Sequence, residues 1–206
     1  PYPPGHPYSW EVIGSMEDLN AASLEDVHEW FRTYYGPSNA VLALAGDIDV
    51  ETAREKVERY FGAIPPGPPV ARHRAWIARM TGDKRESIQD RVPQARFYKV
   101  WNVPQLHTRE GDLLYLAASV LGGGKTSRLY KRLVYDEQLA TDASAFAMLR
   151  ELGGQFLVIA TARPGVDLAK VEAAAAAELK RFLAGGPTPE ELERAKTRYM
   201  AGFLRG

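Results

Sequence analysis

Apolar residues recur at three- and four-residue intervals along much of the chain, a spacing typical of helices that bury one face. The stretches with this pattern are residues 24–34, 50–61, 113–121, 168–182 and 192–203. Several of them follow a residue that caps helix N-termini, such as Ser23, Asp49 or Thr108. The pattern predicts amphipathic helices, and the inward face of the third should be Leu113, Leu116, Ala117, Val120 and Leu121.

Four shorter apolar stretches predict β-strands. Residues 40–45 are continuously apolar, as in a strand covered on both faces. Residues 97–103 are dense in aromatic and β-branched side chains and stop at Pro104. Residues 143–149 and 156–162 flank two glycines, which predicts a hairpin. Together with the helices, these strands predict an α+β fold in which a mainly antiparallel sheet is layered with helices.

The stretch Pro65-Pro66-Gly67-Pro68-Pro69 predicts a domain boundary, because proline neither continues a helix nor donates to a sheet. We therefore place a first domain at residues 1–64, a linker at 65–85 and a second domain at 86–206. Within the first, residues 1–22 read as an extended lead-in. A single predicted strand cannot satisfy its own backbone groups, so we expect its neighbours to come from an upstream segment or another chain.

Three glycines, Gly122, Gly123 and Gly124, separate the helix that ends near Leu121 from a second helix. Glycine tolerates the left-handed backbone that ends helices, and Ser127 is placed to cap the next helix, whose Tyr130, Leu133 and Val134 share a face. An alternative is a phosphate-binding loop built on Gly124-Lys125-Thr126. That motif needs a glycine where Ser119 stands and a strand where the pattern predicts a helix, so the helix-to-helix turn is favoured.

The composition excludes some classes of function. With 26 basic and 26 acidic residues among 206, the chain has no net charge to attract nucleic acid or an anionic membrane. It has no cysteine, which excludes disulfides, zinc-thiolate sites and a cysteine nucleophile. No apolar run reaches the length of a membrane span, and residues 1–5 lack the features of a secretory signal. Because the chain begins at Pro1, we expect a processed product or a fragment.

Common catalytic motifs are missing from the sequence. His28-Glu29 would begin an H-E-x-x-H zinc helix, but Arg32 stands at the second histidine position. His6, His73 and His107 have no partner at zinc-ligand spacing, and no serine lies in a G-x-S-x-G elbow. The residues alone therefore predict a well-formed scaffold without an active site.

Several motifs in order nevertheless resemble the pitrilysin/insulinase family of zinc metallopeptidases. Those resembling the second half of its N-terminal domain are His6-Pro7-Tyr8, Ile13-Gly14-Ser15, residues 24–27, 34–40 and 45–49, and residues 60–65 at its end. Those resembling the next repeat domain are Leu121-Gly122-Gly123, residues 127–130 and residues 188–192. The resemblance implies the second half of one repeat plus most of the next, truncated at its C-terminus.

In that family an inverted H-x-x-E-H motif and a distal glutamate hold zinc, which activates water for attack on a peptide carbonyl. Both lie in a segment upstream of the region seen here. The resemblance thus implies a zinc endopeptidase as the parent protein, with no catalytic residue, no metal ligand and no bound zinc in this chain. Export to the periplasm is favoured over a cytoplasmic location, because bacterial relatives are often exported.

The resemblance also implies contacts with substrate and partner. The glycine-rich loop that handles substrate in processing relatives corresponds to Gly122, Gly123, Gly124 and Lys125. The Arg/Tyr pair that contacts the peptide would fall at Val134 and Thr141, so a second half or partner subunit should supply it. We expect a clamshell dimer acting on peptides. The alternatives are a non-catalytic structural or assembly homologue and, through Gly124-Lys125-Thr126, a nucleotide-binding protein.

Overall fold

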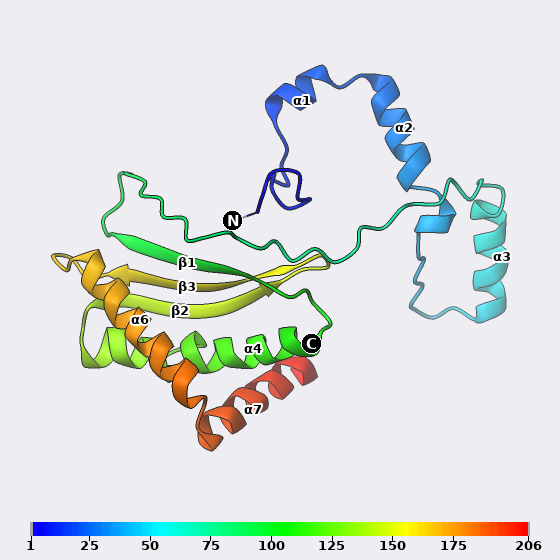
Figure 1. The fold of residues 1–206 in the computed structure, drawn as a ribbon. Coiled ribbons are helices and arrows are strands. Elements are labelled where there is room, and N and C mark those ends of the chain that lie inside the picture. The colour runs from blue at the N-terminus through cyan, green and yellow to red at the C-terminus, as the bar shows by residue number, and fades with distance from the viewer. Residues whose placement is uncertain (1, 206) are drawn as a thin grey trace. The chain divides into compact units, whose positions relative to one another are not determined.

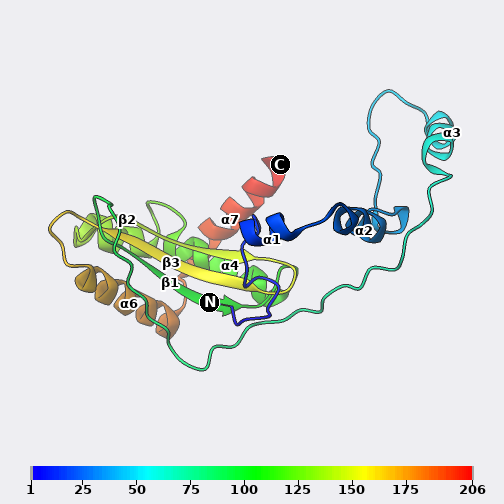
Figure 2. The same cartoon turned by 90° about the horizontal axis from the view of Figure 1, so that it is seen from above.

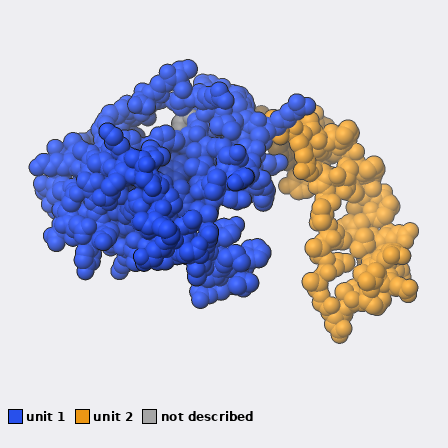
Figure 3. Space-filling view, turned by 60° about the horizontal axis from the view of Figure 1, so that its bottom comes forward, with its two compact units in different colours: residues 1–9, 74–206 blue, residues 10–73 orange. Residues whose placement is uncertain are grey.

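The computed structural model describes residues 2–205, which form two compact units (Figure 3). Residues 10–73 make one unit, and the rest of the described chain makes the other. The assignment of these parts to two repeat domains stays a prediction. No helix in residues 2–205 combines the length and apolar character needed to cross a bilayer.

The larger unit is an antiparallel sheet with helices on one face (Figure 1). Its strands are β1 (Arg96–Val103), β2 (Ala140–Leu149) and β3 (Gly154–Ala162), in the order β1-β3-β2. Helices α4 (Arg109–Gly122) and α6 (Leu168–Gly185) pack against the sheet, and α7 (Pro189–Arg205) packs on α4. A short α5 (Arg128–Tyr130) and a π-helical turn η2 (Lys131–Asp136) follow α4. This arrangement confirms the predicted α+β class, the three strands and the hairpin.

Strand alternation divides the sheet residues between two faces. Val158 pairs with Lys99 and Ala145, and this set faces the helices, where Val158 is fully buried. The next row, Leu157 with Val100 and Phe146, faces the opposite side. On that open face Tyr98, Phe146 and Met148 remain 60%, 38% and 38% exposed. Figure 2, viewed from above, shows that no helix of this unit covers the open face.

Capping residues fix the helix ends as predicted. Thr108 accepts a bond from the Gly111 N–H at the start of α4. Thr188 and Glu191 exchange hydrogen bonds in a capping box at the start of α7. Gly186, with φ of 66°, ends α6 in the left-handed region that glycine favours.

The smaller unit contains α1 (Met16–Ala21), α2 (Leu24–Tyr34), η1 (Pro37–Asn39) and α3 (Val50–Phe61). Ser23 and Asp26 form the predicted capping box of α2, and Asp49 caps α3. The extended lead-in was wrong in part, because Ser15 caps the short helix α1.

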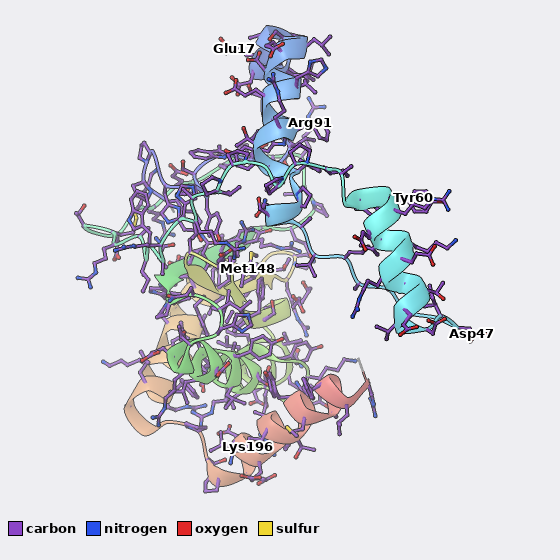
Figure 4. All side chains as sticks on the ribbon, turned by 90° about the vertical axis from the view of Figure 1, so that its right-hand side faces the viewer. Glu17, Asp47, Tyr60, Arg91, Met148 and Lys196 are labelled. Atoms are coloured by element: carbon purple, nitrogen blue, oxygen red, sulfur yellow. The ribbon has the colours of Figure 1, made fainter. Side chains whose placement is uncertain are left out.

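The predicted strand at residues 40–45 is wrong for this chain. The structure assigns it no strand, and Val41 is 97% exposed. An apolar stretch becomes a strand only when a neighbour completes its hydrogen-bond ladder, and the described residues of this unit supply none. The apolar faces of α2 and α3 likewise bury no residue. Tyr60, 65% exposed, projects from α3 in Figure 4.

Two inward faces in the larger unit also differ from prediction. In α4 the predicted Leu116, Ala117, Val120 and Leu121 do pack on the core, but Leu113 is 56% exposed and Leu114 and Ala118 pack inward as well. In α7 only Ala195 is buried, and Phe203 is 76% exposed. These faces lie beside a groove of ≈ 300 Å³ between α4 and α7, across which the Tyr115 and Tyr199 rings meet edge to face.

Candidate functional site

The glycine turn between α4 and α5 is the region that the motifs single out. Helix α4 ends at Gly122, and Gly124 takes a φ of 114°, which lies in the region open to glycine. The Ser127 hydroxyl donates to the Gly124 carbonyl at 2.5 Å instead of capping the next helix. The turn therefore joins two helices, as the favoured interpretation predicted.

Gly122 serves a different purpose from Gly124. A β-carbon at Gly122 would lie 1.8 Å from the backbone nitrogen of Ala145 in β2. Real β-carbons do not approach other atoms so closely, so only glycine lets the end of α4 touch the strand. Gly122 is buried, and its surroundings are explained by helix-to-sheet packing.

The surface at the turn offers little volume. A cavity of ≈ 20 Å³ lies beneath it, about the space of one water molecule. Its lining residues are Ser119, Val120, Thr126, Ser127, Glu191, Arg194, Ala195 and Arg198. Arg198 donates to the Gly123 carbonyl and closes the turn against α7. Small-molecule sites usually measure about 300–1,000 Å³, so this cavity is too small to hold a nucleotide.

A partly buried ion pair joins the turn to α7. The Arg128 guanidinium donates to both carboxylate oxygens of Glu191, at 2.8 and 2.6 Å, and to the Gly186 carbonyl. Arg128 also lies over the Phe182 ring, 5.2 Å from its centroid. These bonds lower the pKa of Glu191 to about 2, assisted by the Thr188 N–H, and raise the pKa of Arg128. The pair therefore stays ionised and holds α5 and α7 together.

A second charged cluster surrounds Glu178, which is fully buried on the inner face of α6. Arg181 lies 2.6 Å and Arg132 3.5 Å from its carboxylate. Arg132 also donates to Glu137 at 2.7 Å, which raises the pKa of Arg132. The cluster ties η2 to α6, so its role is structural.

Of the four residues predicted to bind substrate, Gly124 and Lys125 are exposed, Gly123 is half-buried and Gly122 is buried. Val134 packs against the core, and the Thr141 hydroxyl lies 3.4 Å from Gln94 Oε1 and from the Thr161 carbonyl. Whether any of them contacts substrate stays a prediction.

The part of the chain that the structure describes does not fit a zinc site. In residues 2–205, no group of three or more His, Cys, Asp or Glu side chains is placed to hold a metal ion. His28, His73 and His107 are exposed, and His6 is buried among aromatic rings.

Sequence reasoning missed Arg128, Glu178 and the π-helical turn. Arg128 and Glu191 both lie in motifs noted for the family resemblance, but their 63-residue separation hides the contact. A glutamate within the apolar stripe of α6 was the only local signal for Glu178.

A helix-backed antiparallel sheet, braced by ion pairs between its helices, defines an α+β module. The sequence matches the family model of the peptidase M16 inactive domain over residues 21–199. The chain belongs to this family, which confirms the pitrilysin/insulinase resemblance drawn from the motifs.

Individual relatives agree. Zinc protease PqqE of Helicobacter pylori is 27% identical over 97% of this chain, and the match covers 46% of that relative. The solved structure of a protease from Helicobacter pylori superposes with a TM-score of 0.76 at 25% identity, covering 97% of this chain and 49% of that one. The peptidase M16 inactive domain from Pseudomonas fluorescens, at 21% identity and a TM-score of 0.76, shares the fold over 98% of this chain and 48% of that one. The chain thus spans about half the length of the relatives it matches.

Proposed function

We propose that this chain is a non-catalytic part of a zinc-dependent endopeptidase that cleaves peptides or small unfolded proteins inside a clamshell chamber. The match to the peptidase M16 inactive domain carries the proposal. In this proposal the zinc ligands and the catalytic glutamate lie upstream of these residues in the natural protein, as the family resemblance implies.

The two-sided sheet of the larger unit supports a role as chamber wall. A wall needs one face on its own core and one face free for a peptide or a partner. Helices α4 and α6 occupy the first face, and the second presents the exposed Tyr98, Phe146 and Met148 beside the segment whose Ala78 carbonyl accepts from Asn102. Aromatic and methionine side chains adapt to varied apolar partners, as an unfolded peptide requires.

Exposed apolar residues in the smaller unit support the proposal that another segment completes its fold. Leu42 and Leu44 of residues 40–45 are 53% and 54% exposed, and α2 and α3 leave their apolar faces uncovered. We infer that strands from an upstream segment or another chain pair with residues 40–45, and that α2 and α3 pack on the completed sheet. The first repeat domain of our sequence assignment would then be whole.

Substrate contacts would come from two sources. Gly124 and Lys125 lie at the surface of the glycine turn, where a peptide can reach them. Val134 and Thr141 lack the chemistry of an Arg/Tyr pair, so a second half or partner subunit supplies that pair in a dimer. Export to the periplasm is part of the same proposal.

A non-catalytic structural or assembly subunit is the second candidate, favoured by the match to a domain described as inactive. Fluorogenic-peptide cleavage by the natural protein, with and without residues 86–206, separates the two. We expect zinc-dependent cleavage that is lost with the deletion and restored by adding residues 86–206 back. An intact natural protein that binds no zinc and cleaves no peptide would establish the structural subunit instead.

A further inference from the structure

His6 is a fully buried titratable group for which the proposed function gives no role. Its ring stacks on Tyr2, with centroids 4.6 Å apart and planes inclined by 23°. Trp76 lies 4.6 Å away on a tilted plane, and Tyr8 lies at 5.4 Å. We call these four residues, Tyr2, His6, Tyr8 and Trp76, the aromatic clasp.

Hydrogen bonds define which ring nitrogen of His6 carries the proton. The Trp76 carbonyl, which can only accept, lies 2.9 Å from Nε2. The Tyr8 backbone N–H, which can only donate, lies 3.0 Å from Nδ1. Both bonds form only when Nε2 is protonated and Nδ1 is bare, so the clasp requires neutral imidazole in this tautomer.

Protonation of Nδ1 would oppose the clasp in two ways. It would turn the acceptor into a donor facing the Tyr8 N–H, and it would place a positive charge in a fully buried position. No ion pair with His6 occurs among residues 2–205.

The neighbouring charged groups do not favour an imidazolium. The hairpin loop carries Arg150, whose guanidinium lies 5.2 Å from the Tyr8 ring centroid, and the exposed Glu151. The segment on either side of Trp76 carries Arg74 and Arg79. Burial raises the pKa of Tyr2, which keeps its phenol neutral.

The clasp lies where three segments meet. The chain leaves the larger unit after Ser9 and returns to it at Arg74. The Tyr8 hydroxyl accepts from the Leu152 N–H at 3.2 Å, and the Trp76 N–H donates to the Leu152 carbonyl at 2.6 Å. The clasp therefore joins two segments, residues 2–8 and the segment at Trp76, to the β2–β3 hairpin loop.

We propose that the aromatic clasp is an acid-sensitive latch: protonation of His6 releases residues 2–8 from Trp76 and the hairpin loop. Imidazole is the ordinary side chain that changes charge between pH 5 and 8.

Hydrogen exchange of the Trp76 and Leu152 amides in the full chain tests the latch, after correction for the intrinsic pH dependence of exchange. Ring-nitrogen NMR should find His6 neutral, with its proton on Nε2, at pH 8. Between pH 8 and pH 5 we expect opening of the two amides to increase about tenfold in the wild type and in the His28→Gln control, whose exposed histidine lies in α2. In His6→Phe, opening should not change with pH, whether the clasp of that variant is closed or already open. Unchanged opening in the wild type, or the same pH response in His6→Phe, would overturn the proposal.

Discussion

Gly122 at the end of α4 touches the backbone of Ala145 in the middle of β2, so closely that no β-carbon fits between them. This contact fixes the distance and the rotation of α4 on the sheet. With α4 held in this way, Leu121 and Ala118 are buried against the sheet while Leu113 faces outward.

Gly122→Ala should therefore destabilise the larger unit. The added methyl group forces α4 away from β2, and overpacking of this kind costs about 1–3 kcal/mol or more. Urea unfolding followed by circular dichroism measures the change. Gly202→Ala is the matched control, because Gly202 lies within α7 with nothing within 4 Å of its β position. That variant should gain up to about 1 kcal/mol from helix propensity. Equal stability of the two variants would contradict the close contact.

The partly buried pair of Arg128 and Glu191 should stabilise the fold by an amount that is lost in acid. The pKa of Glu191 in the folded chain is about 2, below its ordinary value of 4.5. A depressed carboxyl pKa adds stability that is complete above the ordinary value and is lost as the pH falls toward the folded value. Glu191→Gln should thus cost about 1–3 kcal/mol at pH 7, and its deficit relative to the wild type should shrink between pH 4.5 and 2.

The control for this prediction is Glu190→Gln on the same helix turn. Glu190 pairs with Arg194 but is 84% exposed, so its loss should leave the unfolding midpoint unchanged. A Glu191→Gln deficit that stays constant from pH 7 to pH 2 would show that the pair does not act through its charge.

Lys125→Ala tests the predicted substrate contact of the glycine turn. Lys125 is exposed, so its truncation should change stability by less than about 0.5 kcal/mol. We assume that Lys125 binds the peptide equally strongly in the ground state and in the transition state. Its loss should then raise KM for peptide cleavage by the natural protein several-fold and leave kcat unchanged. Lys131→Ala, at another exposed lysine in η2, should leave KM at the wild-type value. An unchanged KM in Lys125→Ala would remove this residue from the substrate site.

Local signals in the sequence predicted much of the fold. Capping depends on residues three apart, so Ser23 with Asp26 and Thr188 with Glu191 could be recognised without tertiary information. The hairpin between β2 and β3 followed from strand propensity and the glycines at residues 153 and 154. Each of these features is decided within one or two turns of chain.

What the sequence could not predict depends on contacts between distant residues. The buried position of Glu178 depends on Arg132 in a different element, and the role of Gly122 depends on Ala145. The strand predicted at residues 40–45 failed for the same reason, since strand formation requires a neighbouring strand. For the candidate site, the motifs indicated the turn and the family, while the pairing of Arg128 with Glu191 came only from the structure.

Zinc stoichiometry tests the central claim most directly. Elemental analysis should be made side by side on this 206-residue chain and on the natural protein that contains it. We predict about one zinc ion per natural protein and none in the isolated chain, as expected for a zinc peptidase whose ligands lie outside these residues. Zinc bound tightly by the isolated chain, or absent from the natural protein, would contradict this account.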